Sequence, residues 1–269
     1  DMLTFTPDGS HLLVANEGEP SSYTAPSLAT DPVGSVSVIA VGGLSPTATS
    51  LTRTVRTAGF AAFDGQQAVL QAAGVRIYGP GASVSQDLEP EYITVSADSR
   101  TAYVTLQENN AVATVNIATA SITAIRSLGT KDHSLAGMGM DVSDEDGGLN
   151  TNTGTPSVRI QTVPVKGLYL PDAIASYAVG GQTYLITANE GDARADWPGF
   201  NEEIRVRAHC PLGLDPTVFS DAANQLLDSN LGRLRVTTAP NGNLTGKNPA
   251  GLCTELYSYG ARSFSVWRA

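Results

Sequence analysis

The sequence predicts an all-β fold, a β-propeller of four-stranded antiparallel blades, because one segment occurs three times. The copies are residues 1–20, 91–109 and 172–192, and each runs acid, apolar strand, turn, apolar strand, acid. Their leading acids lie 16, 17 and 18 residues before the closing ones. Two alternating strands around a tight turn form a hairpin. A hairpin cannot bury its own apolar face, so the copies must pack on one another.

Each of the first two hairpins is followed by two more stretches of alternating or β-branched residues. These are residues 34–41 and 51–58, then residues 111–117 and 121–128. Four antiparallel strands in about 40–45 residues are the content of one propeller blade. We therefore expect blades at about 1–58 and 90–128. A β-sandwich is the alternative, but it does not need matching hairpins.

The third hairpin predicts a third blade at about 172–240, completed by residues 203–207 and 233–239. A last hairpin over residues 255–267 reads as the start of another blade at 255–269. Propellers close with roughly four to eight blades, and these strands fill fewer. We expect residues 1–269 to be one region of a longer propeller. Its open sheet edges should be covered by other parts of a longer chain or by neighbouring copies.

Three insertions interrupt the predicted blades. Residues 63–74 read as a short helix, with Asp64 near its start and Gly74 at its C-cap position. Residues 131–166 form a long acidic loop, and residues 210–231 contain a second helical stretch with Asp221 as its N-cap candidate. Loops this long are uncommon without a function.

Charge and composition narrow the partners and the compartment. Lys and Arg total 16 against 26 Asp and Glu, which gives a net charge of −10. This charge excludes nucleic acid as a binding partner, because phosphate binding needs a basic face, and it favours divalent cations as ligands. No apolar run approaches the ~20 residues of a membrane span. The polar, turn-rich composition is typical of an extracellular or cell-surface protein. The chain starts at Asp1 without Met, as a processed or truncated product would.

The two cysteines, Cys210 and Cys253, are expected to form a disulfide in that compartment. The alternative is a pair of buried free thiols.

The acids at the strand ends are the first candidate metal ligands. In a propeller, equivalent positions of successive blades converge on one face near the central axis. Carboxylate oxygens there suit Ca²⁺ or Mg²⁺. The alternative is that these residues cap strand ends and bond only to backbone. The candidates are Glu17, Glu108 and Glu190, with Asn16, Gln107 and Asn189 beside them.

The segment Asp141–Gly148, DVSDEDGG, is the second candidate. Asp141, Asp144 and Asp146 precede two glycines that permit a sharp turn, so the composition resembles a Ca²⁺ loop without the EF-hand spacing. A solvated acidic loop is the alternative. The acids at positions 87, 89 and 91 form a further cluster with the same ambiguity.

Catalytic signatures are weak. Asp132, His133 and Ser134 are adjacent, whereas nucleophilic triads are assembled from separated segments. The sequence has no G-x-S-x-G elbow and no zinc spacing among its three histidines. Asp132 and His133 stay candidates for ligand or substrate contacts.

Arginines offer a candidate anion site. An arginine near the strand-end acids would hold an anion such as phosphate, or else pair with a neighbouring carboxylate. Arg194 is the main candidate, with Arg205, Arg207 and Arg262.

Several long segments together resemble the choice-of-anchor I family of bacterial secreted or surface β-propeller proteins, often labelled alkaline-phosphatase-like. The resemblance implies an extracellular propeller with blades before and after this region, and it implies no particular reaction. The segments are residues 61–65, 74–96, 102–117, 131–148, 165–177, 184–194 and 255–267.

Two function classes follow. The first is a secreted or cell-surface module with a binding or structural role, stabilised by Ca²⁺. The second is a metal-dependent phosphoesterase, alkaline-phosphatase-like or phytase-like, in which acids at the propeller axis hold the metal and an arginine holds phosphate.

Overall fold

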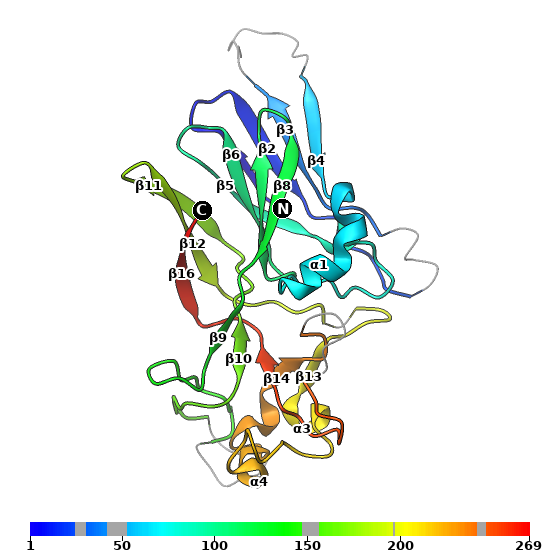
Figure 1. The fold of residues 1–269 in the computed structure, drawn as a ribbon, viewed down its shortest axis with the longest axis vertical. Helices are drawn as coiled ribbons and strands as arrows, with labels where there is room; N and C mark the ends of the chain where they lie inside the picture. Colours follow the sequence, from blue (N-terminus) through cyan, green and yellow to red (C-terminus); the bar gives the residue numbers. More distant parts are fainter. Residues whose placement is uncertain (25–30, 42–52, 147–155, 196, 241–245) are drawn as a thin grey trace.

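The computed structural model describes residues 1–24, 31–41, 53–146, 156–195, 197–240 and 246–269. These residues form four β-sheets with short helical segments between them (Figure 1). Three sheets stack against one another, and the fourth lies beyond them at the lower end of the view in Figure 1.

The first sheet is the four-stranded antiparallel sheet expected over residues 1–58. Leu3 lies opposite Val14 and Phe5 opposite Leu12, which is the expected hairpin pairing. Its strands, in spatial and chain order, are β1 (Leu3–Phe5), β2 (His11–Asn16), β3 (Ser35–Ala40) and β4 (Val55–Gly59).

The second sheet repeats this order over residues 90–127. Its hairpin turn is built like the turn of the first sheet. Asp8 Oδ1 accepts hydrogen bonds from Thr6 Oγ1 (2.6 Å) and the Ser10 nitrogen (2.9 Å). Asp98 Oδ1 likewise accepts from Ser96 Oγ (2.7 Å) and the Arg100 nitrogen (3.1 Å). The strands are β5 (Pro90–Val95), β6 (Thr101–Leu106), β7 (Ala111–Asn116) and β8 (Ser121–Ser127).

The third sheet differs from the expected third blade. It contains β11 (Ile174–Val179), β12 (Gln182–Asn189) and β16 (Ser263–Arg268), in that order. Residues 203–207 and 233–239 do not join it, and residues 255–267 do not start a new blade. The expected blade at 172–240 is therefore wrong, because the partner strand of β12 comes from the end of the chain.

A shared side-chain pattern explains why β16 takes this place. Asn189 Nδ2 donates to Ser263 Oγ (3.0 Å) and Ser265 Oγ (2.8 Å) across the β12–β16 pair. In the first sheet, Asn16 Nδ2 donates to Ser35 Oγ (3.2 Å) and Ser37 Oγ (2.9 Å) of β3. The S-x-S-V pattern of β3 and β16 thus matches an asparagine at the end of the preceding strand.

The strands of the fourth sheet come from two parts of the chain. Two lie between the second and third sheets, and three lie between β12 and β16 of the third sheet. Its order is β13-β14-β15-β10-β9, and only the β10–β15 pair is parallel among the pairs described. The strands are β9 (Thr130–Asp132), β10 (Lys166–Leu168), β13 (Glu203–Arg205), β14 (Arg235–Thr237) and β15 (Tyr257–Ser258).

The helical segments are short. The expected helix over residues 63–74 is the 3-10 segment η2 (Ala61–Gln66) followed by α1 (Gln67–Ala72), and Gly74 follows with a φ of +92°. Asp221 occupies the N-cap of α4 (Ala222–Gln225) as expected, although its side chain makes no capping bond. The others are α2 (Val84–Asp87), α3 (Val206–His209) and η3 (Leu231–Arg233).

Three apolar clusters hold these layers together. The largest lies between the first and second sheets, where Leu13 and Val38 pack with Val104 under α1 and α2. A smaller cluster joins the second and third sheets through Val112, Ile174 and Leu185. The first strands lie next to one another, β5 against β1, β2 and β11, and β4 lies against β8.

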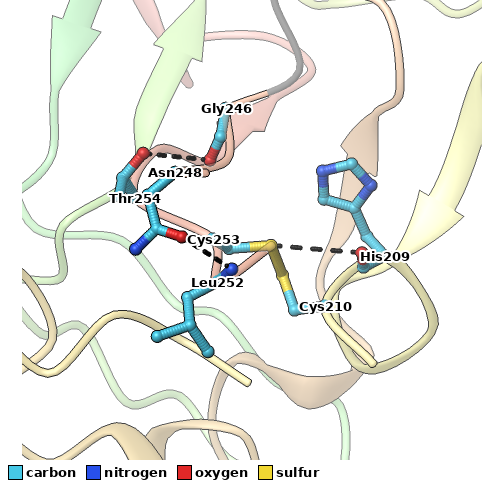
Figure 2. Close-up of a disulfide and its surroundings, with 7 residues drawn as sticks. All are labelled: His209, Cys210, Gly246, Asn248, Leu252, Cys253 and Thr254. Atoms are coloured by element: carbon cyan, nitrogen blue, oxygen red, sulfur yellow. Dashed lines mark hydrogen bonds between the residues drawn. A yellow bond between two sulfur atoms is a disulfide. The ribbon is translucent and has the colours of Figure 1, made fainter. Parts of the chain in front are cut away.

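The third cluster lies under the fourth sheet and contains the disulfide. Cys210 and Cys253 are bonded, as predicted, and both are fully buried with Cα atoms 5.8 Å apart (Figure 2). The bond ties the end of α3 to the loop that precedes β15. That loop is further held by Asn248 Oδ1, which accepts from the Leu252 nitrogen (3.0 Å), as Figure 2 shows. No helix in the part of the chain described is long and apolar enough to cross a membrane.

Candidate functional site

The ends of the first strands bring three carboxylates together. Asp1 precedes β1, Glu17 follows β2 and Glu91 lies near the start of β5. One carboxylate oxygen from each lies within 4.8 Å of the others. The stacking of β5 against β1 and β2 produces this meeting, because it aligns the ends of two hairpins. Asp1 is exposed, so the cluster is open to solvent.

A fourth carboxylate, Glu108, lies near this group but outside the set of converging oxygens. It follows β6 and is 7% exposed, and its Oε2 has no hydrogen-bond partner. Its charge raises the pKa of both Glu17 and Glu91. A buried carboxylate oxygen without a partner costs free energy.

Burial and mutual repulsion raise the pKa values of these acids. Desolvation raises the pKa of Glu91 to about 9, and the charges of Glu108 and Glu17 add to the effect. Desolvation also raises the pKa of Glu17 and of Glu108. The carboxylates repel one another when ionised, and a divalent cation between them would remove that repulsion.

Stability of the cation-free protein should therefore fall as the pH rises. A carboxyl group with a raised folded-state pKa binds its proton more tightly in the folded state, so the proton stabilises the fold. This contribution is complete below the ordinary pKa, near 4.5, and is lost as the pH rises through about 9. We expect the melting temperature measured in EDTA to decrease between pH 5 and pH 9. Glu91→Gln should flatten that decrease, and an equally steep profile in the variant would contradict the assignment.

The third sheet brings acids near the cluster, but they are not the predicted Glu190. Asp172 and Asp192 both raise the pKa of Glu91, and Asp192 also raises that of Glu108. Glu190, the expected equivalent of Glu17, is exposed and does not belong to the converging group. Asp192 lines a small cavity of about 60 Å³ together with Glu108 and Arg194.

Arg194 is engaged by buried carboxylates beside this cavity. It is 4% exposed, donates to Asp87 Oδ1 (2.7 Å) and Glu89 Oε2 (2.5 Å), and lies 4.6 Å above the Tyr78 ring. One NH2 hydrogen also goes to the Asp87 carbonyl oxygen (2.9 Å). The geometry favours carboxylate pairing over anion binding. Asp87 and Glu89 thus hold Arg194, whereas Glu91 lies with the candidate metal ligands Asp1 and Glu17.

A second buried arginine lies close to the first. Arg76 is fully buried, forms an ion pair with Glu202 and donates to the Glu108 carbonyl oxygen (2.6 Å). Glu202 Oε1 accepts from the Arg194 backbone nitrogen (3.0 Å). This network fixes the backbone of both Glu108 and Arg194, and so positions the acid cluster.

The acidic loop does not gather its predicted ligands. Asp144 pairs with Arg233 through bonds of 2.5 and 2.8 Å, and Asp146 Oδ1 accepts from Ser157 Oγ (2.9 Å). Asp141 is not grouped with them in any converging set of described carboxylates. The two glycines at 147 and 148 lie outside the described residues.

The adjacent Asp132, His133 and Ser134 do not form a catalytic set. Asp132 Oδ1 accepts from the Ser134 nitrogen (2.9 Å) and Oγ (2.6 Å), which is a local turn. His133 is fully buried, and its Nδ1 lies 2.6 Å from the Met138 carbonyl oxygen. Desolvation lowers the pKa of His133, so the ring is a neutral core group.

Comparison with known proteins identifies the family. The choice-of-anchor I domain model matches residues 1–269, the whole chain. The chain belongs to the choice-of-anchor I family. Membership of this family implies a surface-associated protein, as the resemblance in the sequence suggested.

Other comparisons of this choice-of-anchor I chain add little. A search of curated proteins found no match. Among solved structures, the chain is similar to a protein described as Kuenenia stuttgartiensis hydrazine synthase, at 14% identity and a TM-score of 0.30. The match covers 72% of this chain and 29% of that chain, and it carries no argument about fold or function.

Sequence reasoning missed Asp1 as a ligand candidate and grouped Glu91 with the acids at 87 and 89, although Asp1 and Glu91 each lead a copy of the repeated hairpin. Their position was the available signal: in antiparallel hairpins the residue before the first strand lies beside the residue after the second. Arg76 and Glu202 had no comparable signal, since they are 126 residues apart.

Proposed function

We propose that this chain is part of a surface β-propeller module with a binding or structural role, stabilised by one divalent cation. The cation lies where the first strands of the stacked sheets meet, at the propeller axis. The observation that carries the proposal is the convergence of Asp1, Glu17 and Glu91 beside the unpartnered Oε2 of Glu108.

Ca²⁺ is the cation that fits these groups best. All four side chains offer carboxylate oxygens, which are hard ligands, and Ca²⁺ accepts six to eight oxygens in flexible geometry. The exposure of Asp1 leaves room for water to complete the shell. The net charge of −10 further favours cation binding.

A calcium titration tests the site. EDTA should lower the melting temperature and added Ca²⁺ should restore it, because an ion that binds only the folded state stabilises it, by about 2.7 kcal/mol at a hundred times Kd. Glu91→Gln should weaken this response at least tenfold in Ca²⁺ concentration. Asp144→Asn, in the other candidate loop, is the matched control and should respond like the wild type. An unchanged melting curve with EDTA and Ca²⁺ would refute the proposal.

The propeller arrangement is supported by the outer faces of the stack. The outer face of the first sheet exposes Leu3, Phe5 and Val55. The outer face of the third sheet exposes Tyr177, Val179, Ile186, Phe264 and Val266. Exposed apolar faces of this extent favour packing against further sheets. In the proposal, other parts of a longer polypeptide supply those sheets and continue the ring.

Without those sheets, the 269-residue chain should self-associate through the uncovered faces. Phe264 is 72% exposed on the third sheet, so Phe264→Lys should shift the solution mass toward the monomer. Val158→Lys, at an exposed site beside the fourth sheet, is the control and should leave association unchanged. Light scattering after size-exclusion chromatography measures both. A wild-type chain that stays monomeric at high concentration would contradict the proposal that further sheets cover the outer faces of the first and third sheets.

An extracellular location agrees with the buried disulfide, since such bonds persist in oxidising compartments. The alternative function is a phosphoesterase at the same axis. It requires a positively charged side chain that binds phosphate beside the metal ion. Arg194 was the candidate, and its donors point to Asp87 and Glu89. The binding or structural role is therefore the function that the geometry supports best.

A further inference from the structure

The fourth sheet borders a cavity of about 770 Å³ that is rich in arginine. Small-molecule sites have volumes of about 300–1,000 Å³, so the cavity is of a suitable size. Its lining contains the three carboxylates of Asp141, Asp144 and Glu203 and four cationic side chains. The cationic side chains are Arg205, Arg233, Arg235 and Arg262.

Two of these arginines are placed against each other. Arg205 of β13 and Arg235 of β14 are direct cross-strand partners, and both line the cavity. Like charges directly opposite on a sheet destabilise it. The carboxylate of Glu203, two residues before Arg205 in β13, pairs with Arg235 and offsets one of the two charges.

The nearby carboxylates neutralise only some of the arginines. Asp144 and Glu145 pair with Arg233, and Glu203 pairs with Arg235. Within the described ranges, neither Arg205 nor Arg262 forms an ion pair with a carboxylate.

Arg262 is also held in an unusual backbone conformation. Its φ is +46°, in the left-handed region that is costly for a residue with a side chain, and its NH1 donates to the Asp141 carbonyl oxygen (2.7 Å). Strain of this kind concentrates at functional sites. Here it accompanies an arginine that lines the cavity without a carboxylate partner.

We infer that this cavity binds a small organic anion through its carboxylate or phosphate oxygens. Arg205 and Arg262 supply charge-assisted hydrogen bonds to the bound anion. Arg233 and Arg235 are already paired with carboxylates. The site is separate from the carboxylate cluster at the first strands and does not depend on it.

Calorimetric titration of calcium-free protein with citrate and with pyrophosphate tests the inference. We expect at least one probe to bind at low salt, and Arg205→Gln and Arg262→Gln to weaken binding at least tenfold. Arg100→Gln, an exposed arginine in the turn of the second sheet, removes the same charge elsewhere and should bind like the wild type. Citrate binding alone would assign a carboxylate ligand, and pyrophosphate binding alone a phosphate ligand.

A second readout separates a binding role from a structural one. Without probe, Arg205→Gln should leave the melting temperature unchanged or raise it, because it removes the repulsion from Arg235. A clear decrease would mean that Arg205 stabilises the sheet, and would overturn the inference. The same conclusion follows if neither probe binds at millimolar concentration, or if Arg100→Gln weakens binding as much as Arg205→Gln. Failure of Ca²⁺ binding would leave the inference untouched.

Discussion

Glu202→Gln should lower the free energy of unfolding by about 3–5 kcal/mol, because it leaves a buried arginine without its counter-charge. Glu202 and Arg76 are both fully buried and form an ion pair. The carboxylate also accepts from Tyr78 OH (2.8 Å) and Thr237 Oγ1 (2.5 Å). A neutral amide would keep the volume but would not compensate the guanidinium charge.

The position of Glu202 makes the effect global. Arg76 and Tyr78 belong to the segment that packs under the first two sheets, whereas Thr237 lies in β14 of the fourth sheet. Urea unfolding should show a lower midpoint with a similar slope. Glu203→Gln is the adjacent control: its partner Arg235 is mostly exposed, so the loss should be at most about 1 kcal/mol. Equal effects of the two variants would contradict the structural role of the network.

Replacing both cysteines by alanine should lower the free energy of unfolding by about 4 kcal/mol on the chain-entropy model. Cys210 and Cys253 close a loop across 43 residues, and both lie in the core under the fourth sheet. The measurement is urea unfolding with and without a reducing agent. Reduction should destabilise the wild type and leave the double variant unchanged. A loss below about 1 kcal/mol would mean that the surrounding core holds this region without the bond.

The sequence was sufficient to predict the first two sheets and the disulfide. Their strands are five to seven residues long apart from the three-residue β1, alternate regularly and follow one another in the chain, so local pattern and spatial order agree. The third sheet shows the limit of this reasoning. β16 pairs with β12 across a segment of more than 70 residues. The S-x-S-V pattern that β16 shares with β3 is the only sequence signal for this pairing.

The fourth sheet and the buried network lay beyond sequence pattern. Strands of two or three residues, such as β15 and β13, carry no readable periodicity. For the candidate site, convergence of strand-end acids was predicted, and Glu17 takes part in it. Glu190 does not, and the arginine expected near the acids is held by Asp87 and Glu89. Such pairings depend on tertiary contacts between residues far apart in the chain.

The location of a bound calcium ion distinguishes the carboxylate cluster at the first strands from the other candidate cation sites. Crystals of the protein grown with Ca²⁺ and measured at long wavelength would reveal the ion by its anomalous scattering. We expect one strong peak among the carboxylates of Asp1, Glu17 and Glu91, with Glu108 turned toward it. An empty cluster in crystals that hold Ca²⁺ at another place, such as the Asp141–Asp146 loop, would contradict it.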